Sequence, residues 1–100
     1  MTKTTREEFL ELTNRGIYFA RKGNYEKAIS CFDKGIEIWP KRGTALYNKS
    51  AGLCLLERYD EALSLLEEAF RLEPDLKDLS KQNIAFDGIR NDEKFKKIFI

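Results

Sequence analysis

The two cysteines, Cys31 and Cys54, are the side chains of this sequence best suited to nucleophilic attack, metal binding or disulfide formation. They lie 23 residues apart, they form no CxxC pair, and the sequence contains no histidine. These spacings match no usual zinc pattern, and the lack of histidine removes the base that commonly activates a serine or cysteine. We therefore interpret each cysteine as a small buried hydrophobic residue, with a disulfide between them as the alternative.

Carboxylates are the next candidates for chemistry, because suitably placed ones act as general acids and bases. Here they fall on the surfaces of expected helices, as in "EKA" at 26–28 and "DEA" at 60–62. The six glycines are scattered singly, so the sequence has no glycine-rich phosphate loop. The sequence therefore predicts a protein that is not an enzyme, with no catalytic, cofactor-binding or metal-binding residues and no cofactor.

The charges are balanced, with 18 lysines and arginines against 17 aspartates and glutamates and a net charge of +1. This balance predicts neither nucleic acid nor a membrane as a partner. No apolar run approaches the ~20 residues that span a bilayer, and the N-terminal residues have no stretch of the signal-peptide type. A cytoplasmic protein is expected.

Apolar residues recur at helical spacing along nearly the whole chain. Thr5 and Glu8 have the spacing of a capping box at the start of the first helix, although Thr4 is an alternative start. Gly23 and Asn24 separate the first two helices, and prolines end the second and fourth. Four helices are expected, at about residues 5–22, 25–38, 44–56 and 59–73. Short connections require each pair to pack antiparallel.

The sequence repeats itself with a period of 34 residues: "NYEKAISCF" at 24–32 returns as "RYDEALSLL" at 58–66. Small residues (Gly16, Ala28, Ser50, Ala62) are expected where the helices of a hairpin cross closely. The matching positions of the first copy are Leu12, Gly16, Phe19, Gly23, Tyr25, Ala28, Phe32, Gly35 and Pro40. Those of the second are Leu46, Ser50, Leu53, Tyr59, Ala62, Leu66, Ala69 and Pro74. This pattern resembles the tetratricopeptide repeat family.

The resemblance implies an all-α fold of antiparallel helical hairpins stacked as a short right-handed α-solenoid. We expect a single domain over 1–100, with repeat one at 9–42, repeat two at 43–76 and a divergent capping segment at 77–100. One more helix is expected in "DLKDLSKQN" at 75–83, with Leu76 and Leu79 facing inward. Asp92 is expected to cap a short final helix with Phe95, Ile98 and Phe99, and the apolar chain end is expected to dock on its own chain or a neighbour's.

The resemblance also implies that the first helix of each hairpin lines a concave surface. Both of these helices carry a second apolar stripe beyond the one needed to pack their own hairpin, and the second stripe must face something. Groove residues are predicted to be Leu10, Thr13, Ile17, Arg21, Thr44, Tyr47, Asn48, Ala51 and Leu55, with Lys81 at one edge. Either a partner or the chain's own tail or a second copy covers them.

One subgroup of the family grips acidic chaperone tails through lysine, asparagine and arginine side chains, and of the matching positions here only Asn48 fits. The sequence therefore predicts a non-enzymatic module that binds a peptide or helix of another protein in its groove, without that clamp. The alternative is a self-association module that forms a homodimer through the groove or the C-terminal tail. RNA binding is not expected, because the inner helices lack a positive face.

Overall fold

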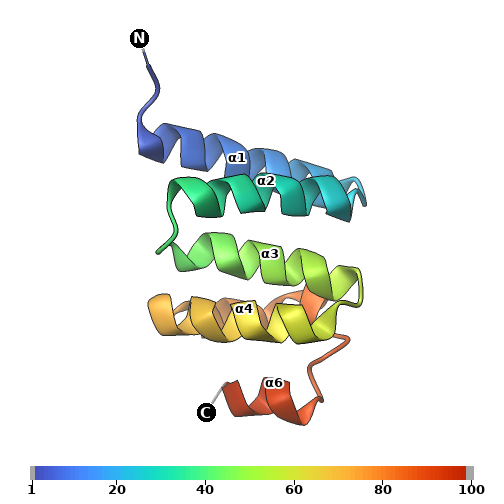
Figure 1. Cartoon of the computed structure of the whole chain (residues 1–100). Coiled ribbons are helices and arrows are strands. Elements are labelled where there is room, and N and C mark those ends of the chain that lie inside the picture. Colours follow the sequence, from blue (N-terminus) through green and yellow to red (C-terminus); the bar gives the residue numbers. More distant parts are fainter. Residues whose placement is uncertain (1, 99–100) are drawn as a thin grey trace.

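The structure is a computed structural model that describes residues 2–98, and all its regular elements are helical (Figure 1). Four long helices come first: α1 (Thr5–Arg21), α2 (Tyr25–Ile38), α3 (Gly43–Leu55) and α4 (Tyr59–Leu72). The C-terminal part holds α5 (Leu76–Gln82), the short 3₁₀ helix η1 (Ile84–Phe86) and α6 (Glu93–Ile98). The predicted all-α fold and its short final helix are confirmed.

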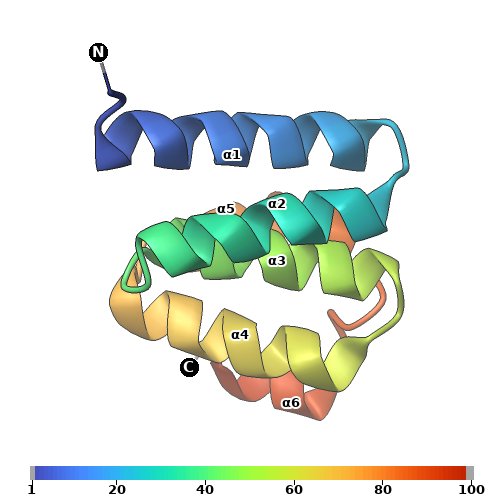
Figure 2. The same cartoon turned by 45° about the horizontal axis from the view of Figure 1, so that its top comes forward.

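The long helices form two hairpins stacked on each other (Figures 1 and 2). Helix α1 packs on α2, α3 packs on α4, and α2 packs on α3 to join the hairpins. The predicted antiparallel hairpins are therefore confirmed, whereas the right-handed sense of a longer superhelix stays a prediction.

The helix ends follow local capping chemistry. The Thr4 hydroxyl accepts a hydrogen bond from the Glu7 amide at 3.1 Å and donates one to the Glu7 carboxylate at 3.1 Å. Thr4, the alternative start, is therefore the N-cap in place of Thr5, and the Glu7 carboxylate accepts from its hydroxyl, not from its backbone amide as in a full capping box. Asn24 caps α2 as predicted, its side chain accepting from the Lys27 amide at 3.3 Å.

Small residues lie where the helices of each hairpin cross. Ala28, Ser50 and Ala62 are fully buried. A Cβ atom added to Gly16 would lie 2.3 Å from a ring carbon of Phe32, so α1 and α2 approach each other more closely than any side chain at this position allows. The repeated small residues are packing residues, as the sequence predicts.

The C-terminal segment folds back on the second hairpin. Helix α5 packs on α3 and α4, η1 lies on α3, and α6 lies on α4 (Figures 1 and 2). Leu76 is buried, but Leu79 is 62% exposed, so the prediction that Leu79 faces inward is wrong. The buried positions of this short helix are Leu76 and Ser80, one turn apart, and η1 follows before a longer buried stripe can form.

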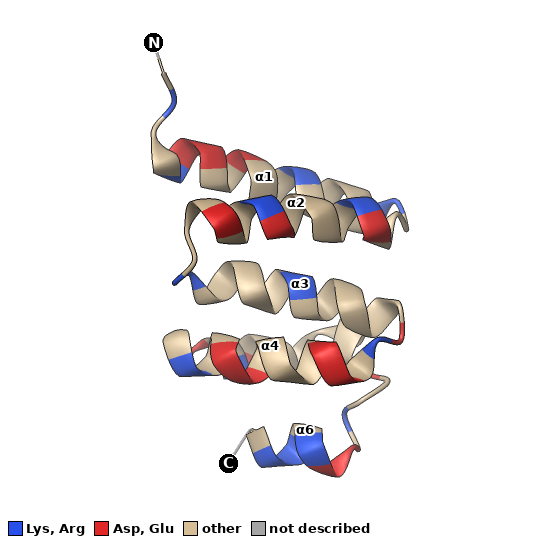
Figure 3. Cartoon of the chain, in the orientation of Figure 1, with Lys and Arg blue, Asp and Glu red and all other residues tan. Residues whose placement is uncertain are grey.

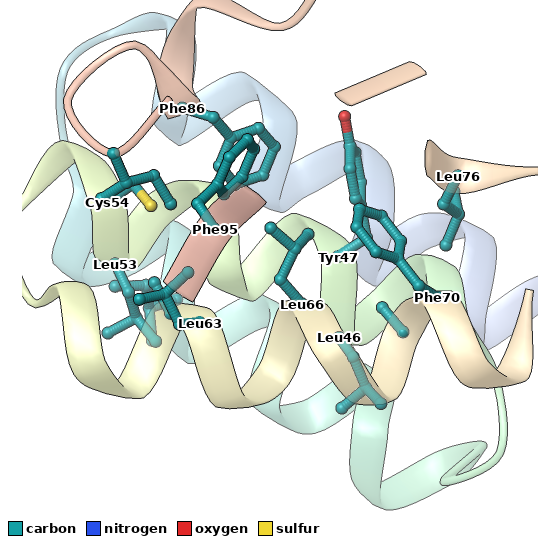
Figure 4. Packing of buried hydrophobic residues seen from close by; sticks show 14 residues of the cluster. Leu46, Tyr47, Leu53, Cys54, Leu63, Leu66, Phe70, Leu76, Phe86 and Phe95 are labelled. Atoms are coloured by element: carbon teal, nitrogen blue, oxygen red, sulfur yellow. The ribbon is translucent and has the colours of Figure 1, made fainter. Parts of the chain in front are cut away.

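Aromatic rings join this segment to the second hairpin (Figure 4). Phe86 is fully buried, with its ring centroid 5.5 Å from that of Tyr47 and 6.1 Å from that of Phe95. Asp92 accepts a hydrogen bond from the Lys94 amide at 2.8 Å at the start of α6, as predicted. Phe95 is buried, so this part of the chain end docks on its own chain, while Phe99 lies outside the described residues.

Candidate functional site

The two cysteines do not form a reactive centre. Both are free and buried, which confirms their interpretation as small hydrophobic residues and excludes the alternative of a disulfide. Burial raises the pKa of the Cys54 thiol to about 12. Within residues 2–98, no group of three or more His, Cys, Asp or Glu side chains is placed to hold a metal ion. No helix in the same range is long and apolar enough to cross a membrane.

A pocket of about 310 Å³ lies between the two hairpins and the C-terminal segment. Helices α1, α2 and α3 and the residues of η1 all contribute to its wall. Half of the predicted groove residues line it together: Ile17, Arg21, Asn48, Ala51 and Leu55. On α3 the spacing of Asn48, Ala51 and Leu55 places them along one face over two turns, which is why the periodicity of the sequence identifies them.

The rest of the wall was not predicted as part of a groove. Ala20 comes from α1, the rings of Tyr25 and Phe32 come from α2, and Gly52 lies between the predicted residues of α3. The remaining residues are Asn83, Ile84 and Ala85, which close the pocket on the C-terminal side. Asn83 precedes an apolar run in the sequence, which is a signal for the residue that caps the start of a helix. No local signal places it against α3.

Tyr47 is buried, so its prediction as an accessible groove residue is wrong. The chain itself covers this side chain: the Asn83 Nδ2 donates a hydrogen bond to the Tyr47 hydroxyl at 3.0 Å, and Phe86 packs on the ring. Burial raises the pKa of the Tyr47 hydroxyl, and the Asn83 hydrogen bond partly opposes this rise. At Tyr47 the second apolar stripe of α3 is therefore covered by the chain's own C-terminal segment.

Four other predicted groove residues lie outside the pocket. Leu10 is 48% exposed on α1. The Thr13 hydroxyl donates to the Phe9 carbonyl at 2.9 Å, so this hydroxyl is hydrogen-bonded within α1. The Thr44 hydroxyl donates to the Glu73 carboxylate at 3.1 Å, where it joins α3 to the end of α4. Lys81 pairs with Asp78 on α5, at 3.4 Å.

Arg90 holds the closing segment in place. Its guanidinium donates to the backbone carbonyls of Ser80, Lys81 and Asn83 at 3.2, 2.8 and 2.7 Å, and also to the Asp87 carboxylate. The first three groups lie at the end of α5, where helical carbonyls have no partner within the helix. Arg90 therefore fixes the turn from α5 into η1, and with it the position of Asn83 in the pocket wall.

The only charged side chain among the described residues of the pocket wall is that of Arg21. The two asparagines supply amide groups, and the other lining residues are apolar apart from the Tyr25 hydroxyl. Asn83 uses its side chain within the fold, because its Oδ1 also accepts from the Ala85 amide at 3.0 Å. The pocket thus offers apolar surface, the amide of Asn48 and one guanidinium, which suits non-covalent binding.

Comparison with known proteins identifies the family of the two hairpins. A family model described as tetratricopeptide repeat matches residues 9–73. The chain is 34% identical to the Protein STIP1 homolog of Dictyostelium discoideum over 65 residues, 65% of this chain and 12% of that protein. It is 42% identical to an uncharacterised protein of Methanocaldococcus jannaschii over 48 residues, 48% of this chain and 56% of that protein.

A third relative, a TPR repeat-containing thioredoxin of Arabidopsis thaliana, is 33% identical over 64 residues, which are 64% of this chain and 9% of that protein. The chain therefore spans little more than half of one of these relatives and about a tenth of the other two. No solved structure gives a significant match. Since the family model covers more than half of the chain and the matched residues form two stacked helical hairpins, the chain belongs to the tetratricopeptide repeat family, with about two repeats.

Proposed function

We propose that this chain is a non-enzymatic interaction module that holds a peptide or helix of a partner protein at its inner surface. Tetratricopeptide repeat domains generally mediate protein–protein interactions and are typically non-catalytic. The observation that carries the finer proposal is the apolar pocket of about 310 Å³ lined by Ile17, Ala51 and Leu55. Open apolar surface of this kind on a folded protein marks a place where another molecule binds.

The acidic chaperone tails bound by one subgroup of the family are not the proposed ligand. The positions that match the clamp hold Thr13, Ile17, Asn48, Asp78 and Gln82. A tail with two carboxylates needs cationic partners, and none of these five residues is cationic. Asp78, which is exposed beside Lys81, would repel such a tail.

The test compares the wild type with Ile17→Glu and with the control Leu79→Glu. Both variants replace an apolar side chain by glutamate, but Leu79 is exposed and lies outside the pocket wall. Proteins captured from a lysate by the immobilised chain are identified, and one is purified for calorimetric titration. We expect Ile17→Glu to weaken binding of the purified partner at least tenfold and Leu79→Glu to leave it unchanged. Equal affinities for all three forms would exclude the pocket as the site.

Self-association is the second candidate, because two apolar residues of the pocket wall, Leu55 and Ile84, are 40% and 79% exposed. Sedimentation equilibrium over a range of concentrations separates the two. A monomer at every concentration removes self-association. A dimer that Ile17→Glu dissociates, and that Leu79→Glu leaves intact, would replace the first proposal by the second.

A further inference from the structure

We infer that the pocket accepts one bulky apolar side chain of the partner, and that Arg21 at its rim pairs with a carboxylate close to that residue in the partner's sequence. This inference rests on the proposed function and goes further, because it names the chemistry of the partner segment. It follows from the size of the pocket, from its closure by the C-terminal segment and from the charge at its rim.

The size of the pocket suits a single anchor. At about 310 Å³ it lies at the lower limit of ligand pockets, which span about 300–1,000 Å³. Aromatic rings and aliphatic side chains form most of the wall, with Tyr25 and Phe32 from α2 and Ala51 and Leu55 from α3. One Leu, Ile, Phe or Trp side chain gains most from burial in such a space.

Because η1 closes one end of the pocket, several apolar side chains of a partner cannot bind there one after another. An open groove over both repeats would take successive apolar residues of an extended peptide or of a helix. Here Asn83 and Ala85 stand in the wall, and Phe86 covers Tyr47, which would otherwise continue the apolar stripe of α3. Arg90 fixes this segment through three backbone carbonyls. The segment therefore forms a fixed end of the pocket for a partner that binds along α1.

The charge at the rim selects an acidic neighbour for the anchor. Arg21 is exposed, and within residues 2–98 its guanidinium takes part in no ion pair or hydrogen bond. Lys22 lies in the turn after α1, and Lys27 lies in the first turns of α2. Their Nζ atoms are 5.7 Å from the centroid of the Tyr18 ring and 5.5 Å from that of the Phe19 ring, and Glu26 is the acid beside them. This end of the first hairpin therefore carries an excess of positive charge (Figure 3).

Pairing at this rim adds specificity to apolar burial. A guanidinium binds a carboxylate through two parallel hydrogen bonds, which are stronger than hydrogen bonds between neutral groups. Because the apolar wall of the pocket excludes water on one side, the pair is screened less than a fully exposed one. A partner with the anchor alone, or with a basic residue next to it, binds more weakly.

The test is selection from a phage-displayed library of random 12-residue peptides. The immobilised wild type is compared with Arg21→Glu and with Lys34→Glu, a matched charge reversal on α2 outside the pocket wall. We expect the wild type and Lys34→Glu to enrich one Leu, Ile, Phe or Trp with Asp or Glu within two positions. We expect Arg21→Glu to enrich Lys or Arg at that place. A synthetic wild-type-selected peptide should bind Arg21→Glu at least tenfold more weakly, and Arg21→Gln to an intermediate degree.

Four results would overturn the inference, and three of them concern the sequences that are selected. These are enrichment of an apolar residue with no acidic neighbour, enrichment of several apolar residues at regular spacing, and the same consensus for wild type and Arg21→Glu. The first two leave the proposed function standing, provided that Ile17→Glu loses the enriched peptides. The inference is also overturned if the wild type enriches no sequence that the Ile17→Glu variant does not enrich equally. The lysate experiment then decides the proposed function separately. Circular dichroism melting curves of each variant show whether it is folded.

Discussion

Glu57 and Gly23 lie 34 residues apart, and each follows the first helix of its hairpin in the left-handed backbone region, with φ of 61° and 79°. The first repeat uses glycine, which adopts this conformation without strain. The second repeat places a residue with a Cβ atom there, and the steric cost is about 1–2 kcal/mol. The second hairpin forms despite this steric cost, because the packing of α3 on α4 determines where the chain must turn.

Glu57→Gly should therefore stabilise the protein. Removing the strain gains about 1–2 kcal/mol, and the greater freedom of glycine in the unfolded chain takes back about 0.4–1 kcal/mol, which leaves a gain of about 1 kcal/mol. Urea unfolding followed by circular dichroism measures it. Gly23→Ala is the converse variant and should lose about 1 kcal/mol. The explanation is wrong if both variants unfold at the wild-type urea concentration.

Gly35→Ala should also stabilise the protein, by up to about 1 kcal/mol, because alanine favours the helix more than glycine does. A Cβ atom at Gly35 would lie 3.6 Å from the Phe9 ring, an ordinary contact. The second repeat already has Ala69 at the equivalent position. Thermal melting would show the gain as a higher midpoint.

Gly16→Ala is the contrasting variant, because its Cβ atom would meet the Phe32 ring at 2.3 Å. Such overpacking costs about 1–3 kcal/mol. The second repeat holds the larger Ser50 opposite the smaller Leu66 at these two positions, so Phe32→Leu should restore part of the stability of Gly16→Ala. If Gly16→Ala melted like the wild type, the close crossing of α1 and α2 would be disproved.

Arg90→Met should destabilise the protein by about 2 kcal/mol, in the range of hydrogen bonds made by a charged group. Three backbone carbonyls lose the hydrogen bond from Arg90, although those of Ser80 and Asn83 keep a backbone donor. Lysine cannot reproduce the planar fork, so Arg90→Lys should restore less than half of the loss. Hydrogen exchange adds a local readout. The Ala85 amide, which donates to Asn83 in the wild type, should exchange faster in both variants. Unchanged exchange at Ala85 would show that Arg90 does not fix η1.

Cys54 should be almost unreactive in the folded protein. Its pKa is raised from 9.0 to about 12, so at pH 8 its thiolate fraction falls about a thousandfold, and reaction with a disulfide reagent should be much slower than in urea. The variant Cys31→Ala isolates this thiol. Comparable rates in buffer and in urea would contradict the prediction.

The sign of the pH effect on stability follows from the same shift. The folded state holds the Cys54 proton more tightly than the unfolded state does. The contribution to stability is therefore complete below pH 9 and is lost as the pH rises towards 12. Unfolding of the Cys54→Ala variant should depend less steeply on pH across this range.

The parts of the structure that the sequence predicts are those set by local spacing. Capping side chains, prolines and the 34-residue period place the four long helices, and one face of α3 gives Asn48, Ala51 and Leu55. Tyr47 lies on the same apolar stripe, and periodicity alone cannot show that a segment 36 residues away covers it. Leu79 was misplaced for a related reason, because which face of a short helix is buried depends on the elements around it.

Ile17 and Ile84 lie 67 residues apart in the sequence and line the same pocket. The pocket is therefore complete only when both ends of the chain are folded, although α1 packs mainly on α2 and α6 lies on α4. A molecule bound between them gains its affinity from the whole fold, and opening of either end by local unfolding removes part of the pocket wall. A molecule in the pocket would therefore couple the folding of α1 to that of η1, the elements that supply Ile17 and Ile84.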